Sequence, residues 1–230
     1  MTDLPPLADV NWPQSYRIIA SRYPPIALFE DVTADPAALD ALIALEQLTN
    51  PRVRDEIGNI ALVPPEDRVT GPGASWVMAA FTHVNSAGSR FSDGTYGVYY
   101  AGQTLDIAIR ETAWHFARIA CASDDGPRRE DMRVLVSSVD CTLHDVTPDD
   151  RDVLDPDDYS AGQALGRSIR AVDGPGVHYP SVRAEGSCVG IFRAPLVPVP
   201  MQERHLQFAY DGARVSRYFD YETDLWFGLD

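Results

Sequence analysis

Apolar and polar positions in the middle of the chain predict a strand followed by a helix. Residues 96–101 (YGVYYA) are rich in the aromatic and β-branched types that strands prefer. Thr104 is a suitable N-cap for a helix that begins at Leu105. Glu111 and His115 lie one turn apart on this helix, at the margin between core and cleft. The stripe beside them, expected to face the core, consists of Leu105, Ile109, Thr112, Phe116 and Ile119.

The N-terminal part of the chain predicts one strand and one helix. Residues 15–20 (SYRIIA) form the strand, and the double proline after Arg22-Tyr23 favours an extended segment. Taken alone, Arg17 and Arg22 are interpreted as structural charges. Asp35-Pro36 is a typical helix start, and this helix should run to about Thr49.

The remaining pattern predicts a mixture of strands and helices. Residues 75–83 are apolar enough for a buried strand or a short helix, and we favour the strand. A helix is expected over residues 160–172, capped by Ser160. The other expected strands cover residues 133–139, 188–193, 205–210 and 214–221, with a hairpin turn at Asp211-Gly212. Because the elements do not alternate as regular βαβ units, the sequence predicts one α+β domain over residues 1–230.

Composition narrows the class of protein. The chain has 45% hydrophobic and 23% charged residues, as ordinary globular proteins do. Its net charge of −15 disfavours direct contact with nucleic acid. All its basic residues are arginines, so an anionic ligand must be held by guanidinium groups. No apolar run has the length of a membrane span, and the N-terminus lacks the features of a signal peptide, so we expect a cytoplasmic protein without membrane contact.

Several common kinds of site are not indicated. The three cysteines form no CxxC pair, and the five histidines lack metal-ligand spacing, so no metal is expected. The aspartate-rich residues 147–158 lack the glycine and glutamate of a calcium loop, and we interpret them as a solvated acidic loop. A nucleophilic pair of Ser181 and His178 is an alternative without a supporting motif.

The residue types that remain suit cleavage of an N-glycosidic bond. When such a bond breaks, the ribose becomes oxocarbenium-like, and a nearby carboxylate stabilises it. Arginines can hold a diphosphate, and tyrosine faces can pack on an aromatic leaving group. Non-catalytic phosphate pockets also contain such residues, so this argument gives compatibility alone.

The motifs GSRF, YYA and IAIRE resemble the central motif of the RES domain, the toxin half of bacterial RES–Xre toxin–antitoxin modules. As in that family, Tyr100 follows Arg90 by about ten positions and Glu111 follows it by about twenty-one. Arg22-Tyr23 resembles the family's early arginine–aromatic pair, and Ser181 in YPSVR resembles its serine. The likeness extends over about residues 15–195. The chain departs from the family in a longer helical or irregular insertion, about residues 31–80, and in lacking the asparagine usual after the serine.

The resemblance implies a fold like that of ADP-ribosyltransferase toxins, with a mixed β core and flanking helices, and NAD+ as the substrate. Arg22 and Arg90 would bind the diphosphate or ribose, and Tyr23 and Tyr100 would line the nicotinamide pocket. Glu111 would hydrogen-bond a ribose hydroxyl and stabilise the oxocarbenium ion. The resemblance also implies that Ser181 hydrogen-bonds the bound dinucleotide.

The resemblance also implies partners. An Xre-type antitoxin would cover the active site and make any contact with DNA. Within the family the chain resembles the ParT-like branch, which implies that it transfers ADP-ribose from NAD+ to a protein. Phosphoribosyl pyrophosphate synthetase is one such target in the family. Two alternatives remain: NAD+ breakdown by water or phosphate, and a non-catalytic module that only binds its antitoxin.

Overall fold

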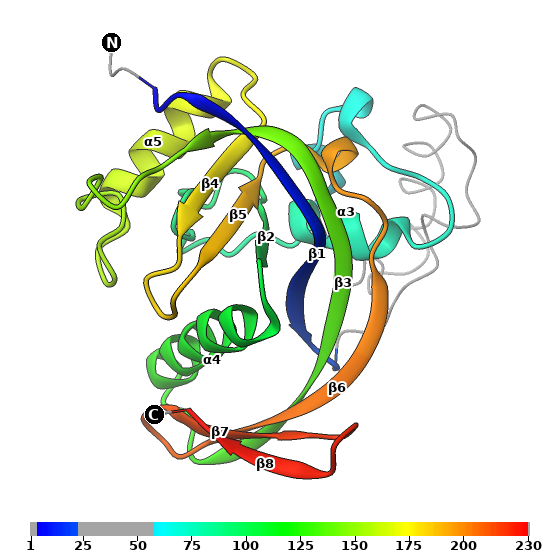
Figure 1. Ribbon diagram of the computed structural model, residues 1–230, viewed down its shortest axis with the longest axis vertical. Coiled ribbons are helices and arrows are strands. Elements are labelled where there is room, and N and C mark those ends of the chain that lie inside the picture. The colour runs from blue at the N-terminus through cyan, green and yellow to red at the C-terminus, as the bar shows by residue number, and fades with distance from the viewer. Residues whose placement is uncertain (1–3, 23–57, 230) are drawn as a thin grey trace.

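The computed structural model describes residues 4–22 and 58–229, and these residues are built around one mixed sheet (Figure 1). The order of its strands is β1-β2-β5-β4-β3-β6-β7-β8. Their bounds are β1 Leu7–Ala20, β2 Tyr99–Gly102, β3 Arg128–Asp145, β4 Gly176–Pro180, β5 Ser187–Ile191, β6 Met201–Tyr210, β7 Val215–Asp220 and β8 Leu225–Gly228.

The long strand β3 joins the two halves of the sheet. It pairs antiparallel with β1 along most of its length, antiparallel with β6 near its start, and parallel with β4 near its end. Because β1 also meets β2 at Tyr16 and Gly102, the strands β1, β2, β5, β4 and β3 close into a ring. Parallel and antiparallel pairs thus occur in one sheet, which confirms the predicted α+β class.

Three α-helices of the described residues cover this sheet: α3 (Ala74–Thr82), α4 (Leu105–Ala122) and α5 (Ser160–Arg170). Helix α3 packs on β1, β2 and β5, whereas α5 packs on β4 and β5. Helix α4 lies on the concave side of the curved strands β1, β3 and β6 (Figure 1). Short 3-10 turns η1 (Ile60–Leu62), η2 (Pro65–Asp67) and η3 (Ala194–Leu196) complete the described elements. None of the helices in these ranges is long and apolar enough to cross a membrane.

Helix α4 begins where the sequence predicts. The hydroxyl of Thr104 accepts the backbone N–H of Ile107 at 3.3 Å, as an N-cap does. The predicted core stripe is wrong at its end, because Ile119 is 56% exposed. Small side chains instead make the contact with the sheet, since Ala113 and Ala120 are buried. Alanine lets the helix axis lie close to the strands, and this displaces the buried face from the one that the large side chains suggest.

Other predicted elements need correction. Residues 75–82 belong to helix α3 rather than to the favoured strand, because alanine and methionine favour a helix that is buried on most sides. The central strand begins at Tyr99 instead of residue 96, and Ser160 is the first residue of α5 rather than its cap. The short strands β4 and β8 were not predicted.

The C-terminal hairpin is confirmed. Gly212 has a φ of 105°, and the Asp211 carboxylate accepts the N–H groups of Ala213 and Arg214. The helix predicted from Asp35 to Thr49 lies outside the described residues, as does the insertion as far as residue 57.

Candidate active site

A cavity of about 130 Å³ lies between helix α4 and the strands that face it. Strands β1, β2, β4 and β5 contribute to its walls. Its ionic side chains are Arg17, Arg90 and Glu111, and its aromatic lining consists of Tyr16, Tyr100, Tyr179 and His115. A carboxylate, two guanidinium groups and several rings therefore surround one small space.

Glu111 is held in this cavity by Ser181. The serine hydroxyl donates to Oε1 of Glu111 at 2.6 Å. The serine oxygen also accepts the backbone N–H groups of Arg183 at 3.1 Å and Ala184 at 3.2 Å. Because both lone pairs of that oxygen are engaged, its single proton is directed at the carboxylate. Ser181 thus supports Glu111 from the β4–β5 connection, while its contact with a dinucleotide stays a prediction.

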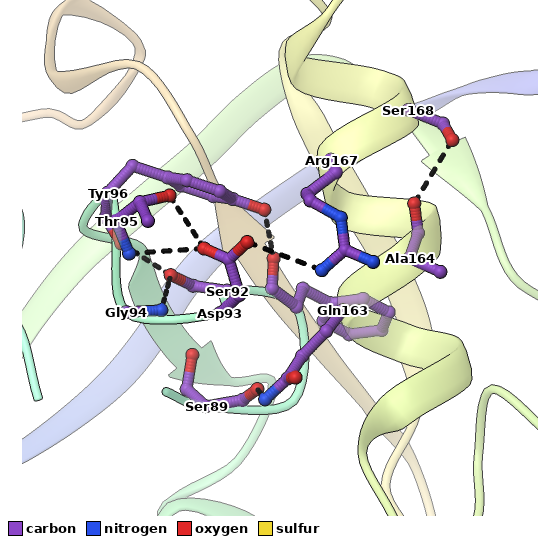
Figure 2. Close-up of polar contacts among 11 residues, drawn as sticks. Ser89, Ser92, Asp93, Gly94, Thr95, Tyr96, Gln163, Ala164, Arg167 and Ser168 are labelled. Atoms are coloured by element: carbon purple, nitrogen blue, oxygen red, sulfur yellow. Dashed lines mark hydrogen bonds and ion pairs between the residues drawn. The ribbon is translucent and has the colours of Figure 1, made fainter. Parts of the chain in front are cut away.

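Arg90 follows Ser89 in a turn. Hydrogen bonds of the neighbouring residues fix this turn from several sides (Figure 2). The turn is closed by the N–H of Ser89, which donates to the carbonyl of Ser92 at 2.7 Å. Gln163 of α5 donates to the carbonyl of Ser89 at 3.1 Å (Figure 2). Arg167 of the same helix pairs with Asp93 at 3.3 Å, and this second contact ties the turn to α5.

Two glycines of α5 allow the helix to touch this turn. A Cβ at Gly162 would lie 2.4 Å from the carbonyl oxygen of Arg90, and one at Gly166 would lie 2.0 Å from that of Phe91. Both distances are far below van der Waals contact. The four-residue spacing of the two glycines puts them on one face of the helix, a pattern in SAGQALG that our sequence interpretation missed.

Arg90 is 3% exposed, and its guanidinium group contacts neutral groups. Its Nη1 donates to the carbonyls of Asp155 at 2.7 Å and Val153 at 3.3 Å. It also lies over the ring of Tyr159, 4.6 Å from the centroid. Within the described residues no ion pair cancels this positive charge. The acidic loop therefore supplies backbone carbonyls that orient a site arginine, a role beyond the solvated loop that we predicted.

Tyr100 connects the central strand to the Arg90 turn. Its hydroxyl hydrogen-bonds the hydroxyl of Ser89 at 2.8 Å and accepts the N–H of Phe91 at 3.0 Å. Tyr100 therefore contacts the residues on both sides of Arg90. Burial raises the pKa of Tyr100 to about 12, and the phenol remains a proton donor at neutral pH. As strand alternation predicts, Tyr100 lines the cavity whereas Tyr99 is in the core. Its role toward nicotinamide stays a prediction.

Arg17 is a cavity residue that the sequence interpretation treated as a structural charge. Its Nη1 donates to the carbonyl of Tyr100 at 3.1 Å, and its guanidinium lies 4.8 Å from the ring centroid of Tyr99. Burial lowers its pKa, although an arginine stays protonated at neutral pH. A single charge within the otherwise apolar segment RIIA was the available indication.

Arg22 does not reach this cavity. It follows the end of β1, where its side chain is 53% exposed and pairs with Glu130 of β3 at 3.1 Å. The cavity borders β1 several residues earlier, at Arg17, which explains why the predicted placement of Arg22 fails. Tyr23 lies outside the described residues. The fold therefore assembles Arg90, Tyr100, Glu111 and Ser181 and leaves Arg22 outside.

His115 and Cys188 are both uncharged members of the cavity lining. Burial first, and then the charges of Arg90, Arg183 and Arg118, lower the pKa of His115 to about 4, so the ring is neutral at pH 7. Burial, and then the charge of Glu111, raises the pKa of the Cys188 thiol. Because the thiolate is the reactive form, Cys188 is poorly suited to act as a nucleophile.

Among the described residues, the side chains form neither the Ser181–His178 nucleophilic pair nor a metal-ligand cluster. Ser181 donates to Glu111, whereas Nδ1 of His178 lies 2.7 Å from Asp145, so the serine and histidine do not form a nucleophilic pair. In residues 4–22 and 58–229 no three His, Cys, Asp or Glu side chains gather as metal ligands do. What the cavity offers is a fixed carboxylate together with two cations and tyrosine rings, a set that can stabilise a developing positive charge beside a bound anion.

Comparison with known proteins finds a matching family model and proteins to which this chain is similar. The RES domain family model matches residues 65–211. The uncharacterized protein y4oC of Sinorhizobium fredii is 24% identical over 207 residues, which cover 90% of this chain and 87% of that protein. The crystal structure of the M. tuberculosis MbcT-MbcA toxin-antitoxin complex contains a chain with 12% identity and a TM-score of 0.46, covering 90% of this chain and 88% of that one.

Proposed function

The chain belongs to the RES domain family, and from that premise we propose that it is an NAD+-consuming toxin that transfers ADP-ribose to a protein. The observation that supports this most is the Ser181–Glu111 pair inside a cavity with Arg17 and Arg90. A carboxylate fixed by a charge-assisted hydrogen bond is already placed before substrate binds.

In this proposal the nicotinamide half of NAD+ enters the cavity. Tyr100 and Tyr179 line the cavity and provide faces on which the nicotinamide ring can pack. The positive charges of Arg17 and Arg90 attract the diphosphate, and Arg17 takes the part that the sequence assigned to Arg22. The remainder of the dinucleotide extends out of the cavity.

Glu111 then acts on the ribose. Its Oε1 is held by Ser181, which leaves Oε2 for a ribose hydroxyl. As the glycosidic C–N bond breaks, its electron pair leaves with nicotinamide and the ribose carbon becomes cationic. The Glu111 carboxylate stabilises that cation until a nucleophilic side chain of the acceptor adds to it and loses a proton. The products are nicotinamide, the ADP-ribosylated acceptor and a proton.

As a toxin, the protein requires a partner that restrains it. We propose an Xre-type antitoxin that covers this cavity, as the RES motif implies. The surplus of acidic residues, with a net charge of −15, makes direct binding of this chain to DNA unfavourable. Any DNA contact of the complex would then come from the antitoxin. Phosphoribosyl pyrophosphate synthetase is a candidate acceptor.

Incubation of the purified chain with NAD+ labelled on the ADP-ribose half tests the reaction. With cell lysate present, label on a protein band supports transfer, whereas free ADP-ribose or its phosphate indicates breakdown by water or phosphate. Unchanged NAD+ would leave only a non-catalytic antitoxin-binding role.

Glu111→Gln is the decisive variant, because it retains the shape of the side chain and removes its charge. We expect nicotinamide release and growth arrest to fall by roughly 100-fold or more, as losing a key electrostatic group does. Glu185→Gln, which changes an exposed glutamate on the β4–β5 connection, is the matched control. If Glu111→Gln remained fully toxic, the assigned mechanism would be wrong.

A further inference from the structure

A second and larger hollow lies along another face of α4, and we call it the arginine groove. Its volume is about 760 Å³, several times that of the cavity. Helix α4 forms one wall, while residues of the β6–β7 hairpin, of the β4–β5 connection and Leu229 form the others. The side chains that define it are Arg110, Trp114, Arg118, Arg183, Arg214 and Leu229.

The charge of this groove is opposite to that of the whole protein. The chain carries a net charge of −15, yet among the described residues arginine is the sole ionic type lining the groove. Arg110 pairs with Asp106, and Arg183 lies 3.9 Å from Asp157. Arg118 and Arg214 are exposed and form no ion pair with a described residue. The groove is therefore a local positive site on an acidic surface, and it suits a ligand that carries carboxylates.

The floor of the groove is apolar. Four buried residues form it, and their side chains have no hydrogen-bonding group: Ala113, Ala117, Val215 and Leu229. Trp114 stands at one side, with the Arg183 guanidinium 3.8 Å from its ring centroid. An apolar floor between tryptophan and arginine is typical of a protein-binding surface, where these two residue types provide most of the binding energy.

The groove and the cavity meet at α4. Trp114 belongs to the groove and Glu111 to the cavity, and they lie one helical turn apart. The Trp114 ring also contacts that of His115, with centroids 5.1 Å apart. Arg183 follows Ser181 by two residues on the same connection. A segment bound in the groove would thus pass beside the carboxylate that we assign to the ribose cation.

We propose that the arginine groove docks an acidic segment of the protein that accepts ADP-ribose. This inference rests on the proposed transfer reaction and adds the surface that selects its acceptor. Acidic side chains of the segment meet Arg118 and Arg214, and its apolar side chains lie on the alanine floor. A short segment fits this local charge, whereas a long nucleic acid would also meet the acidic remainder of the surface.

The test separates transfer from cleavage in the same preparation. Nicotinamide release from NAD+ is measured without lysate, and label transfer to protein is measured with lysate. The groove variant is Arg118→Glu/Arg214→Glu, and the control is Arg129→Glu/Arg151→Glu, which changes the net charge equally at exposed arginines outside both hollows. We expect the ratio of transfer to release to fall about tenfold in the groove variant and less than about twofold in the control.

A competitor identifies the chemistry of the occupant. A synthetic peptide of alternating glutamate and leucine should reduce protein labelling without changing nicotinamide release, and its lysine–leucine counterpart should not. Stronger inhibition by single-stranded DNA than by the acidic peptide would overturn the proposal in favour of a nucleic-acid site.

The remaining outcomes are distinct. Undiminished labelling by the groove variant would refute the docking surface and leave the transfer reaction intact. If the wild-type chain cleaved NAD+ but labelled no protein, the docking surface would also be refuted, and the proposal that the chain consumes NAD+ would stand. Absence of cleavage in the wild-type chain would remove the proposed function itself.

Discussion

Replacing Ser181 by alanine tests how the candidate site is built. The substitution removes the hydroxyl that donates to Glu111 at 2.6 Å and leaves the carboxylate free to rotate. A hydrogen bond to a charged group contributes about 1.5 to 3 kcal/mol. If that energy is fully expressed in the transition state, kcat for NAD+ cleavage should fall roughly 10- to 100-fold. The backbone N–H groups of Arg183 and Ala184 also lose their acceptor, so a modest drop in melting temperature is expected.

The kinetic constants distinguish two roles for this serine. If Ser181 positions Glu111, kcat falls while KM stays nearly constant, and Ser181→Ala adds little in a Glu111→Gln background, because the two residues act together. If Ser181 binds the dinucleotide directly, as the family resemblance implies, KM rises instead. Ser168→Ala, which removes an exposed hydroxyl bound to the Ala164 carbonyl on α5, is the matched control. Unchanged kcat in Ser181→Ala, with the protein still folded, would refute the positioning role.

Three further predictions follow from neighbouring contacts. Gly166→Ala should destabilise the protein by about 1 to 3 kcal/mol and impair the Arg90 turn, since the new Cβ would lie 2.0 Å from the carbonyl oxygen of Phe91. Chemical denaturation measures this loss, and Gly126→Ala, at an exposed glycine, is the control. Arg17→Met should raise KM for NAD+ more than it lowers kcat, because it keeps the bulk of the side chain but removes a cation from the cavity, and an unchanged KM would contradict this. His115 should lower the free energy of unfolding on acidification. Its pKa of about 4 in the folded protein is below the ordinary 6.5, so the unfolded chain binds the proton first. Stability should therefore fall as the pH drops from 6.5 toward 4. Thermal melts from pH 8 to 4 should show a shallower decline in His115→Asn, and parallel curves would refute this.

Local sequence patterns determined the elements near the site. Thr104 caps the helix as predicted, and the alternation of Tyr99 and Tyr100 separates the core face from the cavity face. Such features depend on residues a few positions apart, whose geometry the backbone sets by itself. The spacing of Arg90, Tyr100 and Glu111 identified the family for the same reason, because one turn, one strand and one helix carry all three.

Longer-range contacts could not be derived from those patterns. The Ser181–Glu111 bond joins residues 70 positions apart, and the Arg90 guanidinium is oriented by carbonyls of the acidic loop more than 60 positions away. Taken alone in the sequence, Arg17 and Arg22 are equivalent charges, and the family resemblance favoured Arg22. The place where β1 meets β2 decided that Arg17 lines the cavity instead. The sequence thus determined which residue types lie on each element. Only the tertiary structure decided which of them meet, because strand pairing and helix packing set distances that no local spacing contains.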